Sequence, residues 1–160
     1  MGVEIERKFL LKNANWRKGP NESTKIRQGY LSSNIDRTIR VRTMGKIGII
    51  TIKGRTTNMT RKEYEYEIPF DDATELFELC EQPLIEKTRY KIVYNSKVWE
   101  VDEFEGVNKG LILAEIELNS EDEEIEIPEW IGKEVTLDPR YYNSNLAKHP
   151  YSKWNKERDD

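Results

Sequence analysis

Short segments in which apolar and charged residues alternate recur along this 160-residue chain. The first, residues 3–10, has Glu4, Glu6 and Lys8 at period two with apolar residues between them. Because successive side chains of a β-strand point to opposite sides, these three charges share one face. The pattern predicts a strand whose charged face is suited to hold a metal ion and a phosphate.

Other segments repeat the alternation with bases in place of acids. Residues 38–43 and 86–94 have basic side chains at period two, and residues 49–53 end on one further base. We therefore expect three strands with a positively charged face. The bases concerned are Arg40, Arg42, Lys53, Lys87 and Arg89.

Acidic faces return along the rest of the chain. Residues 61–68 have carboxylates at period two, residues 97–104 have acids on one face, and residues 112–118 nearly repeat the opening motif. Asn95 and Ser96 are typical of a two-residue hairpin turn before the second of these segments. The acids concerned are Glu63, Glu65, Asp102, Glu115 and Glu117.

With a further strand expected at residues 25–31, the pattern gives about eight strands, which allows two arrangements. In an open sheet, the apolar face packs on helices and the charges face water. In a closed barrel, charges of both signs line the interior, while helices and loops cover the apolar exterior. Strands of one charge sign repel on a water-exposed face but pair when acidic strands face basic ones, which favours the barrel.

The predicted fold class is mainly β (α+β), an eight-stranded antiparallel closed β-barrel with helices packed outside and a C-terminal helix. A charged interior is costly unless its charges are paired. A triphosphate would pair the bases, and divalent cations would pair the acids. Because the candidate metal ligands are all carboxylates, Mg²⁺ or Mn²⁺ fits better than zinc or copper.

Composition excludes several classes of protein. A formal net charge of -4 argues against a nucleic acid or an anionic membrane as partner. The single cysteine allows no internal disulfide, and no apolar run is long enough for a signal peptide or a membrane span, so we expect a cytoplasmic protein. Residues 1–160 contain no linker-like stretch and predict a single domain.

Two regions are predicted to be helical. Residues 71–80 form an amphipathic stretch with Asp71 and Asp72 as candidate caps, and Cys80 is expected to pack in the interior. Residues 120–124 resemble an acidic helix start with a capping box, and residues 138–148 a last helix. The tryptophans expected to be packing residues are Trp16, Trp99, Trp130 and Trp154.

The order of acidic and basic strands resembles the CYTH superfamily, the triphosphate tunnel metalloenzymes. Glu4, Glu6 and Lys8 match its opening Glu-x-Glu-x-Lys signature, and the bases and acids named above match its later strands. The resemblance implies an eight-stranded antiparallel tunnel that binds a triphosphate and, with a divalent metal, usually hydrolyses it. Members include inorganic tripolyphosphatases, thiamine triphosphatases, RNA triphosphatases and class IV adenylate cyclases.

The resemblance also ranks the substrates. The cyclases have a His-Phe pair upstream of the acidic motif, whereas only three residues precede Glu4, which disfavours a cyclase. Short bacterial members that share the opening octapeptide and the Arg-Gln-Gly-Tyr-Leu run of residues 27–31 act chiefly on inorganic tripolyphosphate. We expect metal-dependent hydrolysis of tripolyphosphate to pyrophosphate and phosphate, with nucleoside or thiamine triphosphate as alternatives.

The hypothesis gives each charged residue a role. Phosphate oxygens would be held by Lys8, Arg40, Arg42, Lys53, Lys87 and Arg89. Metal ions would be held by Glu4, Glu6, Glu63, Glu65, Glu115 and Glu117, which Asp102 could join directly or through water. The candidate catalytic residues are Glu4, Glu6 and Lys8, together with Lys87 and Tyr30, either of which could protonate or orient a reacting group.

Three questions stay open in the sequence. In relatives a C-terminal helix can plug one tunnel mouth, so Arg140, Tyr141 and Lys148 either gate the tunnel or cover the barrel's apolar exterior. A module that only binds polyphosphate or nucleotides would need the bases but not both acid pairs, which favours an enzyme, and a charged interior argues against a lipocalin-like carrier. A homodimer is possible.

Overall fold

The computed structural model describes residues 2–20 and 22–154. Within that part of the chain, nine strands form one antiparallel sheet in the order β5-β4-β3-β2-β6-β7-β8-β1-β9. The strands are β1 (Gly2–Leu11), β2 (Glu22–Asn34), β3 (Arg37–Met44), β4 (Ile47–Gly54), β5 (Thr60–Ile68), β6 (Ile85–Tyr94), β7 (Lys97–Phe104), β8 (Ile112–Glu117) and β9 (Ile131–Glu134).

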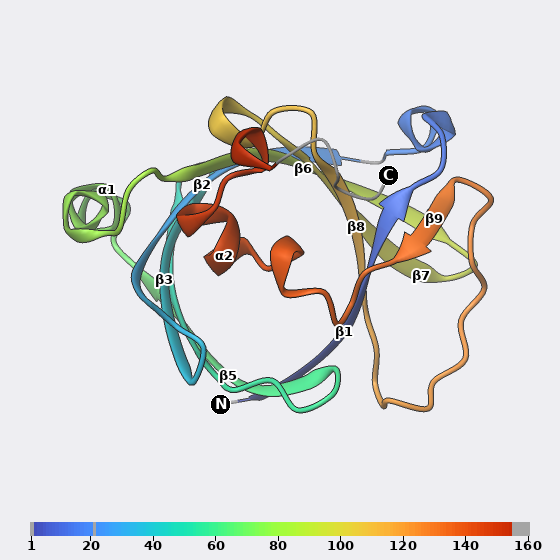
Figure 1. The fold of residues 1–160 in the computed structure, drawn as a ribbon, viewed down its shortest axis with the longest axis horizontal. Helices are drawn as coiled ribbons and strands as arrows, with labels where there is room; N and C mark the ends of the chain where they lie inside the picture. The colour runs from blue at the N-terminus through green and yellow to red at the C-terminus, as the bar shows by residue number, and fades with distance from the viewer. Residues whose placement is uncertain (1, 21, 155–160) are drawn as a thin grey trace.

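The first strand closes the sheet into a barrel. The first half of β1 pairs with β5, from Gly2 opposite Glu63 to Ile5 opposite Thr60. Its second half pairs with β8 and also accepts the short strand β9. The predicted closed eight-stranded barrel is therefore confirmed, with one extra strand, and the open-sheet alternative is wrong (Figure 1).

Apolar residues between the charges form the outer layer, as the alternation predicted. Trp99 and Val101 on β7 pack with Ala114 and Ile116 on β8. The 3₁₀ helix η1 (Asn15–Lys18) and the segment that leads into β9 cover this cluster with Trp16 and Trp130. The four tryptophans are buried, so their predicted packing role is confirmed.

A short helix covers the opposite wall. α1 (Phe70–Leu76) continues into the 3₁₀ helix η2 (Phe77–Leu79), and together with Cys80 these elements pack on Val41 of β3. Cys80 is a free, buried cysteine, as expected. The predicted caps are wrong, because the N-cap position is Pro69, so Asp71 and Asp72 lie within the first turn.

The acidic segment at residues 120–124 is not helical, which corrects the expectation of a helix start. Its side chains form tertiary contacts instead. Glu121 accepts hydrogen bonds from Asn58 and Thr60, and Glu123 accepts from Lys97. Glu123 also accepts from the backbone N–H of Asn119 at 2.6 Å, so its carboxylate joins a local contact to a tertiary one without a helix following.

The C-terminal segment is a series of short turns rather than the predicted continuous helix. It comprises η4 (Pro139–Tyr141), α2 (Asn143–Lys148) and η5 (Tyr151–Lys153). The break falls at Tyr142, whose backbone is extended at φ -69° and ψ 133°. The predicted start is correct, because the Asp138 side chain accepts from the backbone N–H of Arg140 and Pro139 follows it.

This segment enters one end of the barrel, where α2 lies within the ring of strands (Figure 1). Leu146, Ala147 and Trp154 pack against Phe104 and Leu113. Those two residues share the inner strand faces of Asp102 and Glu115 by the period-two rule. An apolar plug therefore fills one end of the interior and leaves the charged part open.

None of the helices in residues 2–20 and 22–154 is both long and apolar enough to cross a membrane.

Candidate active site

The barrel interior contains a cavity of about 270 Å³ whose wall is mainly charged. Side chains from all eight strands of the barrel, β1 to β8, line it. The residues singled out in the sequence that line it are Glu4, Glu6, Lys8, Tyr30, Arg40, Arg42, Lys53, Glu63, Glu65, Lys87, Arg89, Glu115 and Glu117. Asp102 lies behind the wall rather than on it.

Cross-strand register decides which charges meet. Lys8 on β1 is opposite Glu115 on β8, and their side chains form an ion pair at 3.3 Å between Nζ and Oε2. One step along the same pair, Glu6 is opposite Glu117. The same two strands therefore form one ion pair between opposite charges and, one inward-facing position further along, place two acids opposite each other.

Glu4 is held by two bases. Its carboxylate accepts from Lys53 Nζ at 3.0 Å and from Arg61 Nε at 3.2 Å. Burial alone would raise its pKa, but Lys53 and Arg61 outweigh burial and lower the pKa to about 2. Glu4 is therefore ionised at neutral pH.

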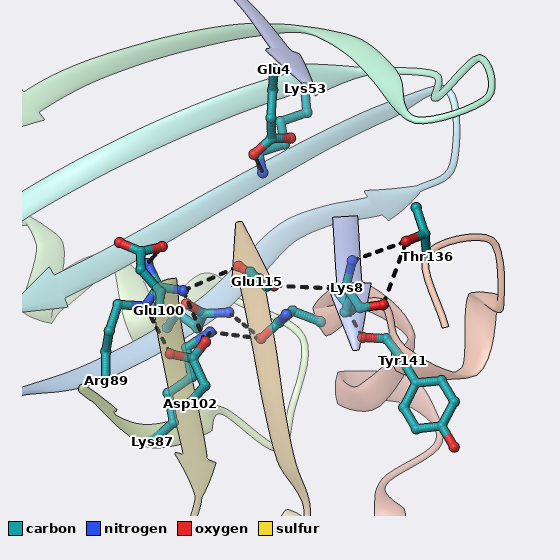
Figure 2. A network of polar contacts seen from close by, with 12 residues as sticks. Glu4, Lys8, Lys53, Lys87, Arg89, Glu100, Asp102, Glu115, Thr136 and Tyr141 are labelled. Carbon is teal, nitrogen blue, oxygen red and sulfur yellow. Dashed lines mark hydrogen bonds and ion pairs between the residues drawn. The ribbon is translucent and has the colours of Figure 1, made fainter. Parts of the chain in front are cut away.

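Asp102 on β7 holds two bases of the neighbouring strand β6 (Figure 2). Arg89 donates to both of its carboxylate oxygens at 2.8 Å, and Lys87 Nζ lies 2.7 Å from Oδ2. Burial would raise the pKa of Asp102, but Arg89 and Lys87 hold it well below its usual range. Asp102 is 1% exposed and is paired with these two bases, and its contact with metal stays a prediction.

Two bases of the cavity have lowered pKa values. Burial lowers the pKa of Arg42 to about 9, helped by Arg40 and Arg89, and its Nε donates only to the neutral Gln28 Oε1 at 2.8 Å. Burial also lowers the pKa of Lys87 to about 7, although Asp102 opposes the shift. Among the described residues, the buried Nε of Arg40 has no hydrogen-bond partner. Such groups favour a bound anion.

The acids show the complementary imbalance. Burial raises the pKa of Glu6 to about 8, with Glu115 and Glu4 adding to the shift. Burial and Glu4 also raise the pKa values of Glu63 and Glu117. A cation placed among these carboxylates would remove their repulsion.

The donor chemistry therefore fits a hard divalent cation, because every available ligand here is a carboxylate oxygen. As the side chains stand, no three acids, histidines or cysteines of the described residues are grouped closely enough to hold a metal ion. Glu4 and Glu115 are instead occupied by Lys53 and Lys8.

Tyr30 lies where the cavity meets the apolar plug. It is buried among the plug residues, and its hydroxyl accepts from Gln28 Nε2 at 3.4 Å. Its hydroxyl is therefore tied to the same amide that accepts from Arg42.

Sequence reasoning missed several residues of this site. Arg61 has the parity of Glu63, and Glu100 has that of Asp102, so the period-two rule could have found both. Arg89 contacts Glu100 at 3.2 Å. Asn143 from α2 also lines the cavity, and no local pattern marks it.

Comparison with known proteins adds independent findings. A family model described as the CYTH domain matches residues 2–150. An inorganic triphosphatase of Acetivibrio thermocellus is 50% identical over 152 residues, covering 94% of this chain and 97% of that protein. An inorganic triphosphatase of Nitrosomonas europaea is 37% identical over 149 residues, covering 91% and 97%. A crystal structure of an inorganic triphosphatase, 35% identical, superposes with a TM-score of 0.64 and covers 90% and 97%.

Proposed function

The chain belongs to the CYTH domain family and is a triphosphatase, and we propose that it hydrolyses inorganic tripolyphosphate to pyrophosphate and phosphate with a divalent cation. The observation that carries the proposal is a cavity lined by charges of both signs, in which, among the described residues, Arg42 forms no ion pair with an acid and Glu6 and Glu117 form none with a base, while the pKa values of both acids are raised. An anionic chain and a cation together would complete both sets.

The basic residues that line the cavity are the proposed substrate-binding groups. A linear triphosphate has oxygens along its whole length, and bases lie on β1, β3, β4 and β6 around the cavity. Charge-assisted hydrogen bonds from these bases would hold the chain and offset the negative charge that grows on the leaving pyrophosphate. The proposed phosphate ligands are Lys8, Arg40, Arg42, Lys53, Lys87 and Arg89.

The acidic residues that line the cavity are the proposed cation ligands, and Mg²⁺ and Mn²⁺ are the ions proposed. The proposed ligands are Glu4, Glu6, Glu63, Glu65, Glu115 and Glu117. When bound, such an ion lowers the pKa of a water molecule and neutralises phosphate charge. In the reaction, a water oxygen bonds to the terminal phosphorus, the bridging P–O bond breaks, the electron pair leaves with pyrophosphate, and the proton that the water gives up passes to Lys87 or to solvent.

Lys87 is the favoured group for proton transfer with the reacting groups. It lies at the plugged end of the cavity with a pKa near 7, so it can change protonation at working pH. Tyr30 is close to the same end but hydrogen-bonds to Gln28, which supports an orienting role for its hydroxyl.

A second candidate substrate is a triphosphate that bears an organic group. A cavity of about 210 Å³ adjoins the first and shares Thr38, Arg61 and Tyr142 with it. Ile35 and Leu137 add apolar surface to its wall. This neighbouring space favours nucleoside or thiamine triphosphate as the alternative.

Phosphate release separates these possibilities. We would measure kcat/KM for tripolyphosphate, ATP and thiamine triphosphate, each with Mg²⁺, Mn²⁺ or EDTA. We expect metal-dependent release that is fastest with tripolyphosphate. Tight tripolyphosphate binding without release from any substrate would identify a binding module, and a faster reaction with ATP or thiamine triphosphate would select the second candidate.

A further inference from the structure

We propose that Asn143 is a positioning residue that holds Lys87 directly, and Arg42 through Gln28, in the geometry that receives the phosphate chain. The inference rests on the proposed function and deepens it. It assigns to the C-terminal segment a part of the substrate site, in addition to closing one end of the barrel.

One oxygen atom joins the two bases. Asn143 Oδ1 accepts from Lys87 Nζ at 3.0 Å and from Gln28 Nε2 at 3.1 Å. Gln28 Oε1 in turn accepts from Arg42 Nε at 2.8 Å. A continuous chain of hydrogen bonds therefore connects Lys87 on β6, α2, β2 and Arg42 on β3.

The chemistry of the donors fixes the direction of every bond in this chain. Guanidinium and ammonium groups only donate, so each must meet an oxygen. Arg42 therefore requires the oxygen of Gln28, which turns the amide nitrogen of Gln28 toward α2. Lys87 requires the oxygen of Asn143, which is then also available to that nitrogen. A rotation of either amide would oppose donor to donor at one of these bases.

Among the described residues, Arg42 Nε has no neutral acceptor besides Gln28, and Lys87 Nζ has none besides Asn143. Lys87 is balanced by Asp102 on one side, and Arg42 has no acid bound to its Nε. Gln28 is completely buried, so water cannot replace its oxygen at Arg42. Losing the Asn143 oxygen leaves the Gln28 amide nitrogen, among the described residues, with only the 3.4 Å contact to the Tyr30 hydroxyl, and it removes the neutral acceptor that orients the Lys87 ammonium.

α2 is held firmly enough to position a side chain. Leu146, three residues after Asn143, is completely buried in the apolar plug, and Ala147 is nearly so. On the other side of the break, the carbonyl oxygen of Tyr141 accepts from Lys8 Nζ at 3.2 Å. Asn143 thus lies between an apolar anchor and a polar anchor.

Asn143→Ala tests the role against Asn145→Ala as a matched control. Asn145 lies on the same helix, its amide donates to Pro139 O at 2.8 Å, and it lines the adjoining cavity of about 210 Å³ but not the phosphate cavity, so it is a control for tripolyphosphate as substrate. If only the docking of α2 matters, both substitutions should have the same effect. We expect Asn143→Ala to lower kcat/KM for tripolyphosphate about tenfold or more, the loss expected for one hydrogen bond to a charged group, and Asn145→Ala to change it less than about twofold.

Two further measurements separate positioning from folding. Isothermal titration with tripolyphosphate in EDTA measures the phosphate site without turnover, and we expect about tenfold weaker binding for Asn143→Ala at a temperature where the variant is fully folded. Asn143→Asp keeps an oxygen for Lys87 and Gln28, so it should restore kcat toward wild type while raising KM, because its charge repels the substrate. Gln28→Leu combined with Asn143→Ala should cost less than the sum of the single changes.

The outcomes are distinct. Wild-type kcat/KM and wild-type tripolyphosphate affinity in Asn143→Ala would overturn the positioning role and leave the proposed hydrolysis intact. Equal losses in Asn143→Ala and Asn145→Ala would also overturn it, because docking of α2 would then suffice. A wild-type protein that binds tripolyphosphate in EDTA but releases no phosphate with metal would overturn the hydrolase proposal, while the binding measurements would still judge Asn143.

Discussion

Glu6 and Glu117 face each other across the β1–β8 pair, both on the inner wall of the barrel. Like charges directly opposite each other destabilise a strand pair. Neither carboxylate has an ion pair within the described ranges of the chain, and the pKa values of both are raised. The barrel therefore holds two buried acids whose ionised forms are disfavoured, at a place where a cation would stabilise them.

Glu6→Gln should remove a pH dependence of stability. Burial, Glu115 and Glu4 raise the pKa of Glu6 from 4.5 to about 8. The folded state therefore keeps a proton that the unfolded chain loses, so this contribution is complete below pH 4.5 and is lost as pH rises through about 8. In EDTA, Tm of the wild type should fall relative to Glu6→Gln between pH 5 and 9. Parallel curves for the two proteins would contradict the raised pKa.

Divalent metal should stabilise the folded protein through the same acids. Binding to the folded state alone adds about 2.7 kcal/mol when the free ion is at a hundred times its Kd. We expect Mg²⁺ or Mn²⁺ to raise Tm and EDTA to reverse the change and stop phosphate release. Glu6→Gln and Glu117→Gln should lose both responses, whereas Glu103→Gln, a change on the outer face at an ion pair with Arg17, should keep them.

Strand faces could be predicted from the sequence, because parity alone decides which side a residue takes. That rule brought Glu4, Arg40 and Glu115 to one interior without any knowledge of pairing. Register could not be predicted in the same way. It depends on which strands meet and with what offset, and it sets Lys8 opposite Glu115 but Glu6 opposite Glu117.

The sequence also could not predict which inward-facing residues of a strand line the cavity. Glu100 and Asp102 share a face of β7, yet only Glu100 lines the cavity, because Asp102 is opposite Arg89 and fully occupied by it and Lys87. Asn143 carried no signal, since its partners lie 56 and 115 residues away in sequence. The capping pattern at residues 120–124 did not predict a helix correctly, because Glu123 accepts from the backbone N–H of Asn119 and from Lys97 in a segment that is not helical.

Arg42→Ala should reduce activity far more than stability. Arg42 is buried with a pKa lowered to about 9 and no acid on its Nε, so its removal relieves a desolvated charge. Losing its contact with phosphate should lower kcat/KM about ten- to a hundredfold, from about 1.5–3 kcal/mol per hydrogen bond to a charged group. Arg17→Ala, on the outer surface beside Trp16, is the control and should keep wild-type kinetics. A large fall in Tm with unchanged kcat/KM would reverse the assignment of Arg42.

Asp102→Asn should destabilise the barrel even without metal, because it leaves two buried bases without their shared counterion. Breaking a buried ion pair from one side costs about 3–5 kcal/mol. We expect a loss of that size in urea unfolding in EDTA, and a much smaller one for Glu100→Gln, whose carboxylate is partly exposed and forms one ion pair among the described residues, with Arg89. If Asp102 served chiefly as a metal ligand, Asp102→Asn would match wild type in EDTA and differ only when Mg²⁺ is added.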